Sequence, residues 1–196
     1  MSLKTISIDG NEPISPDEAK RQLYIATSNS DNETELLGMI TAARQYAENR
    51  TWRAIVEATY EYRLDAFPEL IELPKPPAII VSSVKYDDTD GVEQTVDASN
   101  YSVDTASEPA RILRNSDFSW PATDNQIDSV RIRYKAGYDG TVNKLPGDMK
   151  AAMLMMVKHF FDNRDAVVVG KRSSIDAVEV PMSTNLLLDM YSLRLS

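Results

Sequence analysis

The chain has 196 residues, 42% of them hydrophobic, with 30 acidic and 21 basic side chains and a formal net charge of -9. This length is enough to bury one sizeable core, and the acidic balance disfavours tight binding to a phosphate backbone. Cysteine is absent, which excludes disulfides, thiolate nucleophiles and cysteine zinc sites. The richest apolar run, residues 149–161, is interrupted by Lys150, Lys158 and His159, and the first residues lack a signal-peptide pattern. We therefore expect no membrane span and synthesis in the cytoplasm.

Residues 1–53 predict an N-terminal helical hairpin that forms part of a helical core. Ser15 can cap a helix, Pro16 suits its first position, and Glu18 completes a capping box, so a helix is expected over 16–26. Apolar side chains spaced by three and four residues predict a second amphipathic helix over 33–49. A run of small polar residues over 27–32 separates the two helices.

Residues 54–137 predict a β-rich insertion. Alternating aromatic and β-branched residues indicate a strand within 55–67, and the proline-rich stretch 73–77 is expected to connect it to the next strand. The turn over 87–91 ends in a glycine and predicts a hairpin. The remaining strands are expected at 79–86, 92–96, 101–103, 111–113 and 129–136.

Residues 138–196 predict the C-terminal helices that complete the core. A broad apolar face over 147–163, rich in methionine, predicts the central helix, and a last helix is expected over 184–193. Between them, an extended hairpin or arm is expected near 166–181. The fold class is therefore predicted to be α+β, with an α-helical bundle core interrupted by a β-rich insertion lobe.

Residues that could carry catalysis are few. His159 is the only histidine, which leaves a Ser-His-Asp triad without a second candidate base and excludes histidine-rich metal sites. The glycines fit neither dinucleotide nor phosphate-loop patterns. Asp87, Asp88 and Asp90 have the wrong spacing for a calcium loop and fit a hairpin tip. We expect no enzyme, no cofactor and no metal; a carboxylate- or metal-dependent hydrolase using these aspartates, or a DNA-binding regulator, remains a distant alternative.

Several segments occur in an order that resembles one protein family. They begin with Ser15-Pro16-Asp17-Glu18-Ala19-Lys20-Arg21-Gln22-Leu23, the helix Leu36 to Ala47 leading to Arg50-Thr51-Trp52, Leu73-Pro74-Lys75-Pro76-Pro77, and Val81 to Gly91. They continue with Ser119-Trp120-Pro121, Val130 to Tyr138, Leu145-Pro146 and the helix ending His159-Phe160-Phe161-Asp162-Asn163-Arg164. In this order, over most of residues 15–165, the chain resembles the head-tail connector proteins of long-tailed bacteriophages and prophages, also called adaptor or head-completion proteins.

The resemblance implies a structural virion protein that assembles as a homo-oligomeric ring in the neck of the particle. The ring would lie between the portal protein and a tail-completion protein, and a dodecamer is one number of subunits that it could have. DNA would pass through its channel without sequence-specific binding, and the isolated protein could stay monomeric until it meets the portal. The resemblance implies no membrane contact and synthesis in the bacterial host cytoplasm. Another phage neck or tail-completion protein is the main alternative.

The sequence also suggests where such a protein would contact its partners. The segment 166–181 has two apolar patches separated by the polar residues 171–176, which is typical of an arm that becomes ordered on a partner. The residues predicted to form this interface are Val167, Val168, Val169, Lys171, Arg172, Ile175, Val178 and Val180.

Overall fold

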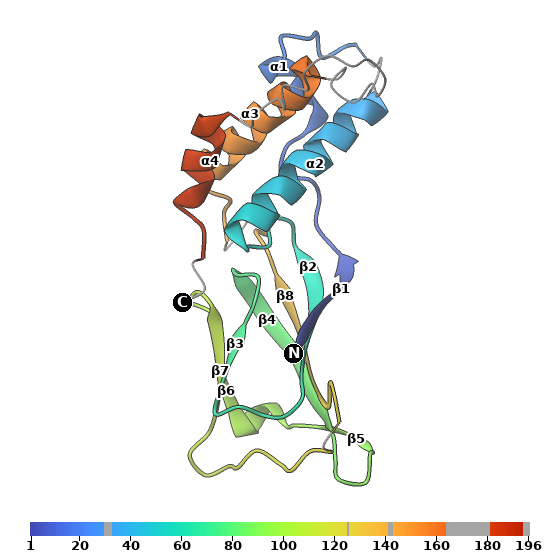
Figure 1. Cartoon of the computed structure of the whole chain (residues 1–196), viewed down its shortest axis with the longest axis vertical. Coiled ribbons are helices and arrows are strands. Elements are labelled where there is room, and N and C mark those ends of the chain that lie inside the picture. The colour runs from blue at the N-terminus through green and yellow to red at the C-terminus, as the bar shows by residue number, and fades with distance from the viewer. Residues whose placement is uncertain (30–32, 125, 141–142, 164–180, 194–196) are drawn as a thin grey trace, which may run out of the picture. The chain divides into compact units, whose positions relative to one another are not determined.

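The computed structural model describes residues 1–29, 33–124, 126–140, 143–163 and 181–193 (Figure 1). The chain divides into two compact units, and each is built from two segments. The β unit comprises residues 1–11 and 52–144. The helical unit comprises residues 12–51 and 145–196. Because the two units alternate along the sequence, the chain passes between them at residues 11–12, 51–52 and 144–145.

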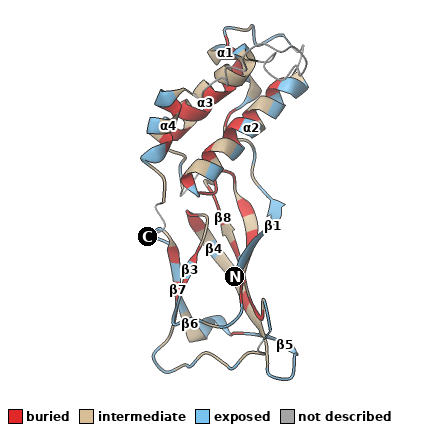
Figure 2. Ribbon diagram, viewed as in Figure 1, coloured by how far each residue is buried: buried red, intermediate tan, exposed pale blue. Residues whose placement is uncertain are grey.

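The helical unit contains α1 (Pro16–Gln22), α2 (Glu33–Thr51), α3 (Gly147–Asp162) and α4 (Met182–Asp189). The predicted capping box at Ser15 is present, since the Ser15 hydroxyl accepts from the Glu18 backbone and the Glu18 carboxylate accepts from the Ser15 backbone. Helix α3 packs against α2 and α4, and the buried positions lie on the helix faces turned toward one another (Figure 2). The residues at the centre of this core are Ile14, Ile40, Ala43, Met149, Met153, Met156 and Leu188.

The β unit is built from two antiparallel sheets. The larger sheet has the order β1-β2-β8-β4-β5, and the smaller one has the order β3-β7-β6. The strands of the first are β1 (Ser2–Ile8), β2 (Ala58–Leu64), β8 (Val130–Ala136), β4 (Ala78–Asp87) and β5 (Glu93–Thr95). The second consists of β3 (Leu70–Leu73), β7 (Ala110–Arg114) and β6 (Tyr101–Asp104). A 3₁₀ turn, Ala98–Asn100, comes directly before β6.

One hydrophobic core is shared by both sheets. The central strand β8 alternates as predicted: Val130, Ile132, Tyr134 and Ala136 are fully buried, while the three basic residues between them face the other side of the sheet. These side chains pack with residues of the smaller sheet, such as Ile112. The Tyr134 hydroxyl donates a hydrogen bond of 2.5 Å to the carbonyl of Pro74, which fixes the proline-rich connection against the core.

The structure confirms the α+β class but corrects its arrangement. Residues 2–8 were expected in the N-terminal helical segment; they form β1 and belong to the β unit, so there is no helical bundle interrupted by one clear β insertion. The strand β3 was also not predicted. Strand β1 has seven residues but is exposed along its whole length, so it lacks the alternating burial that marks a strand in sequence. Strand β3 does alternate between exposed and buried residues, but it has only four residues and ends at the proline-rich stretch, which leaves too short a pattern to predict it. Their pairing partners lie more than 35 residues away in the chain.

Two helices are shorter than predicted. Helix α1 was expected to reach residue 26, but it ends at Gln22, and Tyr24 adopts the left-handed conformation with φ of 59°. Helix α4 was expected to reach residue 193 and ends at Asp189. In both cases the apolar spacing continues past the last helical turn, and spacing alone does not reveal where the backbone leaves the helix.

Candidate assembly surfaces

The predicted interface residues fall outside the described residues. Val167, Val168, Val169, Lys171, Arg172, Ile175, Val178 and Val180 all belong to the range 164–180. The residues on either side of this range are described. Asn163 at the end of α3 and Pro181 before α4 line the same cleft of about 260 Å³ in the helical unit, together with Gln22, Met155, Lys158 and His159. The described residues on either side of the range therefore lie at one place in the helical unit.

Helix α4 exposes an apolar stripe beside this cleft. Met182, Leu186 and Met190 are 86%, 67% and 69% exposed, and their spacing of four residues places them on one face. The opposite face is buried through Thr184 and Leu188. The exposed stripe is therefore a fixed feature of a packed helix, and such exposed apolar side chains are typical of a protein-binding surface.

Two polar contacts anchor α4 to α2. The Tyr46 hydroxyl donates to the Asn185 side chain over 2.6 Å, and Arg50 forms an ion pair with Asp189 in which the Nε to Oδ1 distance is 2.7 Å. These contacts hold the helix with its stripe turned outward. The apolar spacing predicted a last helix over 184–193, but it did not show which of its apolar residues are buried and which are exposed.

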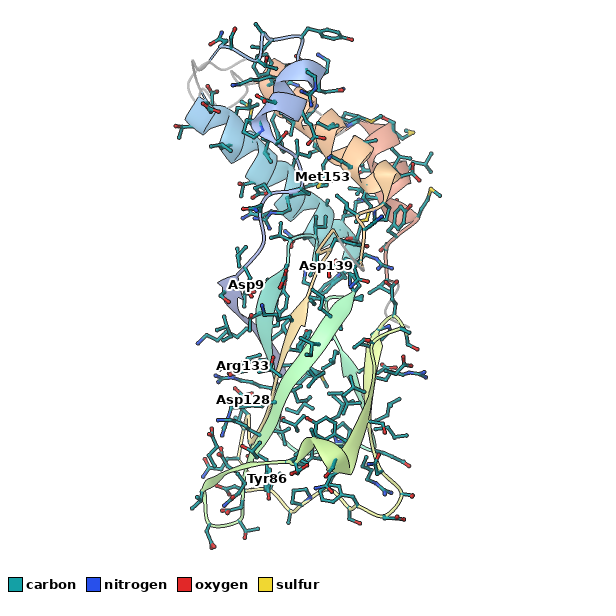
Figure 3. All side chains as sticks on the ribbon, turned by 180° about the vertical axis from the view of Figure 1, so that it is seen from behind. Asp9, Tyr86, Asp128, Arg133, Asp139 and Met153 are labelled. Carbon is teal, nitrogen blue, oxygen red and sulfur yellow. The ribbon has the colours of Figure 1, made fainter. Side chains whose placement is uncertain are left out.

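The outer face of the larger sheet is charged but internally paired. Arg131, Arg133 and Lys135 follow one another on β8, on the face opposite the core. Arg131 binds Asp87 with a shortest distance of 2.6 Å, Arg133 binds Glu61 at 2.8 Å, and Lys135 lies 3.2 Å from Glu57. Figure 3 shows this side of the molecule, with Arg133 and Asp128 labelled. Because carboxylates neutralise this row of cations, the face does not offer an unpaired basic strip to a phosphate backbone.

Glu61 lies at the centre of these ion pairs. Its side chain is nearly buried between Arg63 and Arg133, at 2.6 and 2.8 Å. Burial alone would raise the pKa of the Glu61 carboxyl, but the hydrogen bonds from Arg133 and Arg63 outweigh it, so the pKa lies below its usual value. Glu61 is thus a charged residue that the sheet needs in its ionised form.

Trp52 is an exposed aromatic residue in an unusual backbone conformation. It follows directly after α2, has φ of 58° and is half exposed. The ammonium of Lys75, which also has a positive φ, lies 5.6 Å from the centre of the indole ring. A bulky residue rarely adopts the left-handed region, and such positions cluster at functional sites. Trp52 belongs to one of the segments that carry the family resemblance, but no pattern in the sequence predicts its backbone angle.

The aspartates around the predicted hairpin tip are occupied by protein donors. The Asp88 carboxylate accepts from the backbone of Val92 and Asp90, both at 3.0 Å, and from the Gln94 side chain at 2.9 Å. These bonds, that to Val92 first, lower the pKa of Asp88. The described part of the chain contains no group of three or more histidine, aspartate or glutamate residues arranged to hold a metal ion. Asp88 therefore serves as the internal support of the turn, as the hairpin prediction requires.

His159 occupies a position on α3 that suits a structural role. Its carbonyl accepts a hydrogen bond of 2.7 Å from the Asn163 side chain, and its ring lies beside Phe160. It lines the cleft described above, where its charged neighbours are Lys158 and Asp162, and these two pair with each other at 2.9 Å.

No described helix is both long enough and apolar enough to span a membrane.

Among known proteins, the chain is similar to solved structures and to no family model or curated sequence. No protein-family model and no curated protein sequence matches the chain. Several solved structures match, and three of them do so over 100% of this chain and 98% of theirs. One is from the virion of a native gene transfer agent (GTA) particle, with a TM-score of 0.74 and 19% identity. The others are from the neck of an empty GTA particle computed with C6 symmetry (0.71, 21%) and the neck of a native GTA particle computed with C12 symmetry (0.65, 20%). The chain therefore has the same fold as proteins found in these particles.

Proposed function

We propose that this chain is a structural protein of the neck of a phage-like particle, of the head-tail connector type that its sequence resembles. The observation that carries the proposal is the match of fold over the full length of both chains, at a TM-score of 0.74 for the GTA virion and 0.71 for a GTA neck. The resemblance in sequence and the similarity in fold both support a place in the neck of such a particle.

In this role the chain forms a homo-oligomeric ring between the portal protein and a tail-completion protein. The GTA necks with C6 and C12 symmetry support a ring of identical subunits, and a dodecamer is the form we favour. The protein is made in the host cytoplasm and acts in the virion neck. It can remain monomeric until contact with the portal orders the loops that join the subunits.

The proposed role requires no catalysis. DNA passes through the channel of the ring, and this needs a wall that does not bind it tightly. The net charge of -9 and the paired cations of β8 suit such a wall. A different neck or tail-completion protein is the alternative, and it would differ in copy number and point of attachment.

Two surfaces of the helical unit are the proposed contacts with neighbours. The first is the arm, with Val167, Val168, Val169, Lys171, Arg172, Ile175, Val178 and Val180. The second is the exposed stripe of α4, which begins where the arm rejoins the described chain. A stable contact would bury on the order of 1,000 Å².

The test is the mass and shape of the purified protein, measured by light scattering and negative-stain microscopy over a range of concentrations, with and without portal protein. Rings with a central hole, alone or on the portal, are expected. A protein that stays monomeric and does not bind the portal would contradict the proposal. Attachment to the tail tube without the portal would favour the alternative.

A further inference from the structure

The two edge strands β1 and β6 share a feature that the other edges lack: their core-facing apolar residues are exposed. In β1, Leu3 pairs with Tyr62 and Ile8 with Ala58, and both partners belong to the core side of the sheet. Leu3 and Ile8 are nevertheless 36% and 61% exposed. In β6, Val103 pairs with the fully buried Ile112 and is still 39% exposed. The core is thus left open along both strands.

The other two edges are closed. Strand β3 has both of its core-facing residues, Ile71 and Leu73, at 1% exposure. Strand β5 is three residues long and polar, and its Glu93 is held by Lys85 and Arg131 at 2.7 and 3.0 Å. Short, charged edges such as β5 resist pairing with another chain. Strand β1 has seven residues, and the four-residue β6 leaves Val103 exposed on its core-facing side, so these two edges are the ones where an added strand would cover apolar side chains.

We propose that β1 of one copy pairs with β6 of the next copy, so that the smaller sheet is extended across the subunit boundary. This inference rests on the ring proposed above. In a closed ring of identical chains, each chain contacts its two neighbours through two different surfaces that match each other. The edge strands β1 and β6 provide two such surfaces, because one edge strand can pair with another. Figure 1 shows β1 on one side of the β unit and the β3-β7-β6 sheet on the other, as a head-to-tail contact requires.

The side-chain alternation of the two strands is compatible. Leu3 and Thr5 face the core side of β1, and Lys4 faces the outer side; in β6, Val103 faces the core side, and Ser102 and Asp104 face the outer side. A register that places the apolar residues together also places Lys4 next to Ser102 or next to Asp104, whose carboxylate already binds Arg111 at 2.6 Å and which a second cation can join. Lys4 is exposed and forms no ion pair within the described residues.

Because the chain has no cysteine, disulfide trapping can test the pairing directly. Lys4→Cys and Ser102→Cys proteins are purified separately, mixed under conditions of assembly and oxidised. We expect at least tenfold more covalent dimer from the mixture than from either protein alone. The matched control is Lys4→Cys mixed with Gln94→Cys, which places the second thiol on the closed edge β5.

The possible results separate this inference from the proposed function. Rings that form but yield no more dimer than the β5 control would overturn the strand pairing and leave the neck assignment in place. No oligomer with or without portal protein would overturn both. As a second test, Ile8→Asp should leave tryptophan fluorescence unchanged and reduce assembly at least tenfold, while the exposed Ile127→Asp should assemble normally. Normal assembly of Ile8→Asp would also contradict the pairing.

Discussion

The guanidinium of Arg44 donates from Nε to both carboxylate oxygens of Glu12, over 3.1 and 2.9 Å. Glu12 is the first residue of the helical unit, directly after the chain leaves the β unit, and Arg44 lies at the buried face of α2. The Thr41 hydroxyl also donates to Glu12, and a second carboxylate, Glu48, binds Arg44 Nη1 at 2.8 Å. This contact fixes where the chain enters the helical unit.

Replacing Arg44 should destabilise the helical unit. Arg44→Leu leaves two carboxylates near one another in a partly buried site, and we expect a loss of about 3 kcal/mol in the free energy of unfolding. Urea denaturation followed by circular dichroism at the helix band measures it. The exposed Arg21→Leu is the control and should change the stability by less than about 0.5 kcal/mol. Equal effects of the two substitutions would show that the Glu12 contact contributes nothing.

Gly137 should not tolerate a side chain. Its φ is +130°, and a Cβ there would lie 2.5 Å from the carbonyl oxygen of Val56. Because this clash is with backbone, Gly137→Ala should cost at least about 3 kcal/mol in the stability of the β unit. Both tryptophans, Trp52 and Trp120, lie in that unit, so their fluorescence during urea denaturation reports on it.

Gly140→Ala is the matched control for that substitution. Gly140 also has a positive φ, of +75°, but a Cβ there would meet no atom within 4 Å. We expect a cost of only about 1 kcal/mol from the backbone conformation. If both alanine variants lose the same stability, the close approach to Val56 is not what requires glycine at 137.

Acid should weaken the β unit through Glu61. Since the folded-state pKa of Glu61 is lowered, its contribution is complete above the unfolded-state pKa and is lost as the pH falls through the folded-state value. Glu61→Gln should therefore lose about 1 to 2 kcal/mol at pH 7 and show a smaller further loss than the wild type below about pH 4.5. Tryptophan fluorescence in urea at several pH values measures both.

The exposed Glu69→Gln serves as its control, because Glu69 makes no ion pair within the described residues. Its stability should follow the wild type at every pH. If Glu61→Gln also follows the wild type, the two arginines do not stabilise the ionised carboxyl, and the assignment of Glu61 as the centre of the ion pairs is wrong.

Helix α4 offers two leucines in opposite environments. Leu188 is fully buried, and Leu188→Ala should cost about 2 to 5 kcal/mol in the helical unit. Leu186 lies two residues earlier on the exposed face, and Leu186→Ala should change the stability by less than about 0.5 kcal/mol. Circular dichroism in urea compares the two. A large loss for Leu186→Ala would mean that its side chain is buried in the folded protein.

Deleting Val167 to Val180 should abolish oligomers and leave a folded monomer. Asn163 and Pro181 line one cleft, so a short glycine-serine linker can join α3 to α4. The expected result is a monomeric mass by light scattering with an unchanged helical spectrum. As a control, the same linker inserted between Asn163 and Arg164 of the intact chain should not prevent assembly. Rings formed by the deletion variant would show that the arm is not a subunit contact.

The sequence alone determined the elements whose side chains alternate between core and solvent. The capping box at Ser15, the face of α3 with Met149, Met153 and Met156, and the alternation along β8 were all predicted, since each follows from contacts within one turn or one strand. The hairpin tip at Asp88 was predicted for the same reason: its hydrogen bonds reach no further than Gln94.

Only the tertiary structure decided which apolar residues stay exposed and which segments join one unit. Strand β1 exists through its pairing with β2, 50 or more residues away, and the stripe of α4 faces outward because the opposite face, with Thr184 and Leu188, is buried. These outcomes depend on contacts between distant segments, whose free energies local spacing does not encode. The sequence thus identified the helices and central strands, and the tertiary structure decided which apolar surfaces stay exposed.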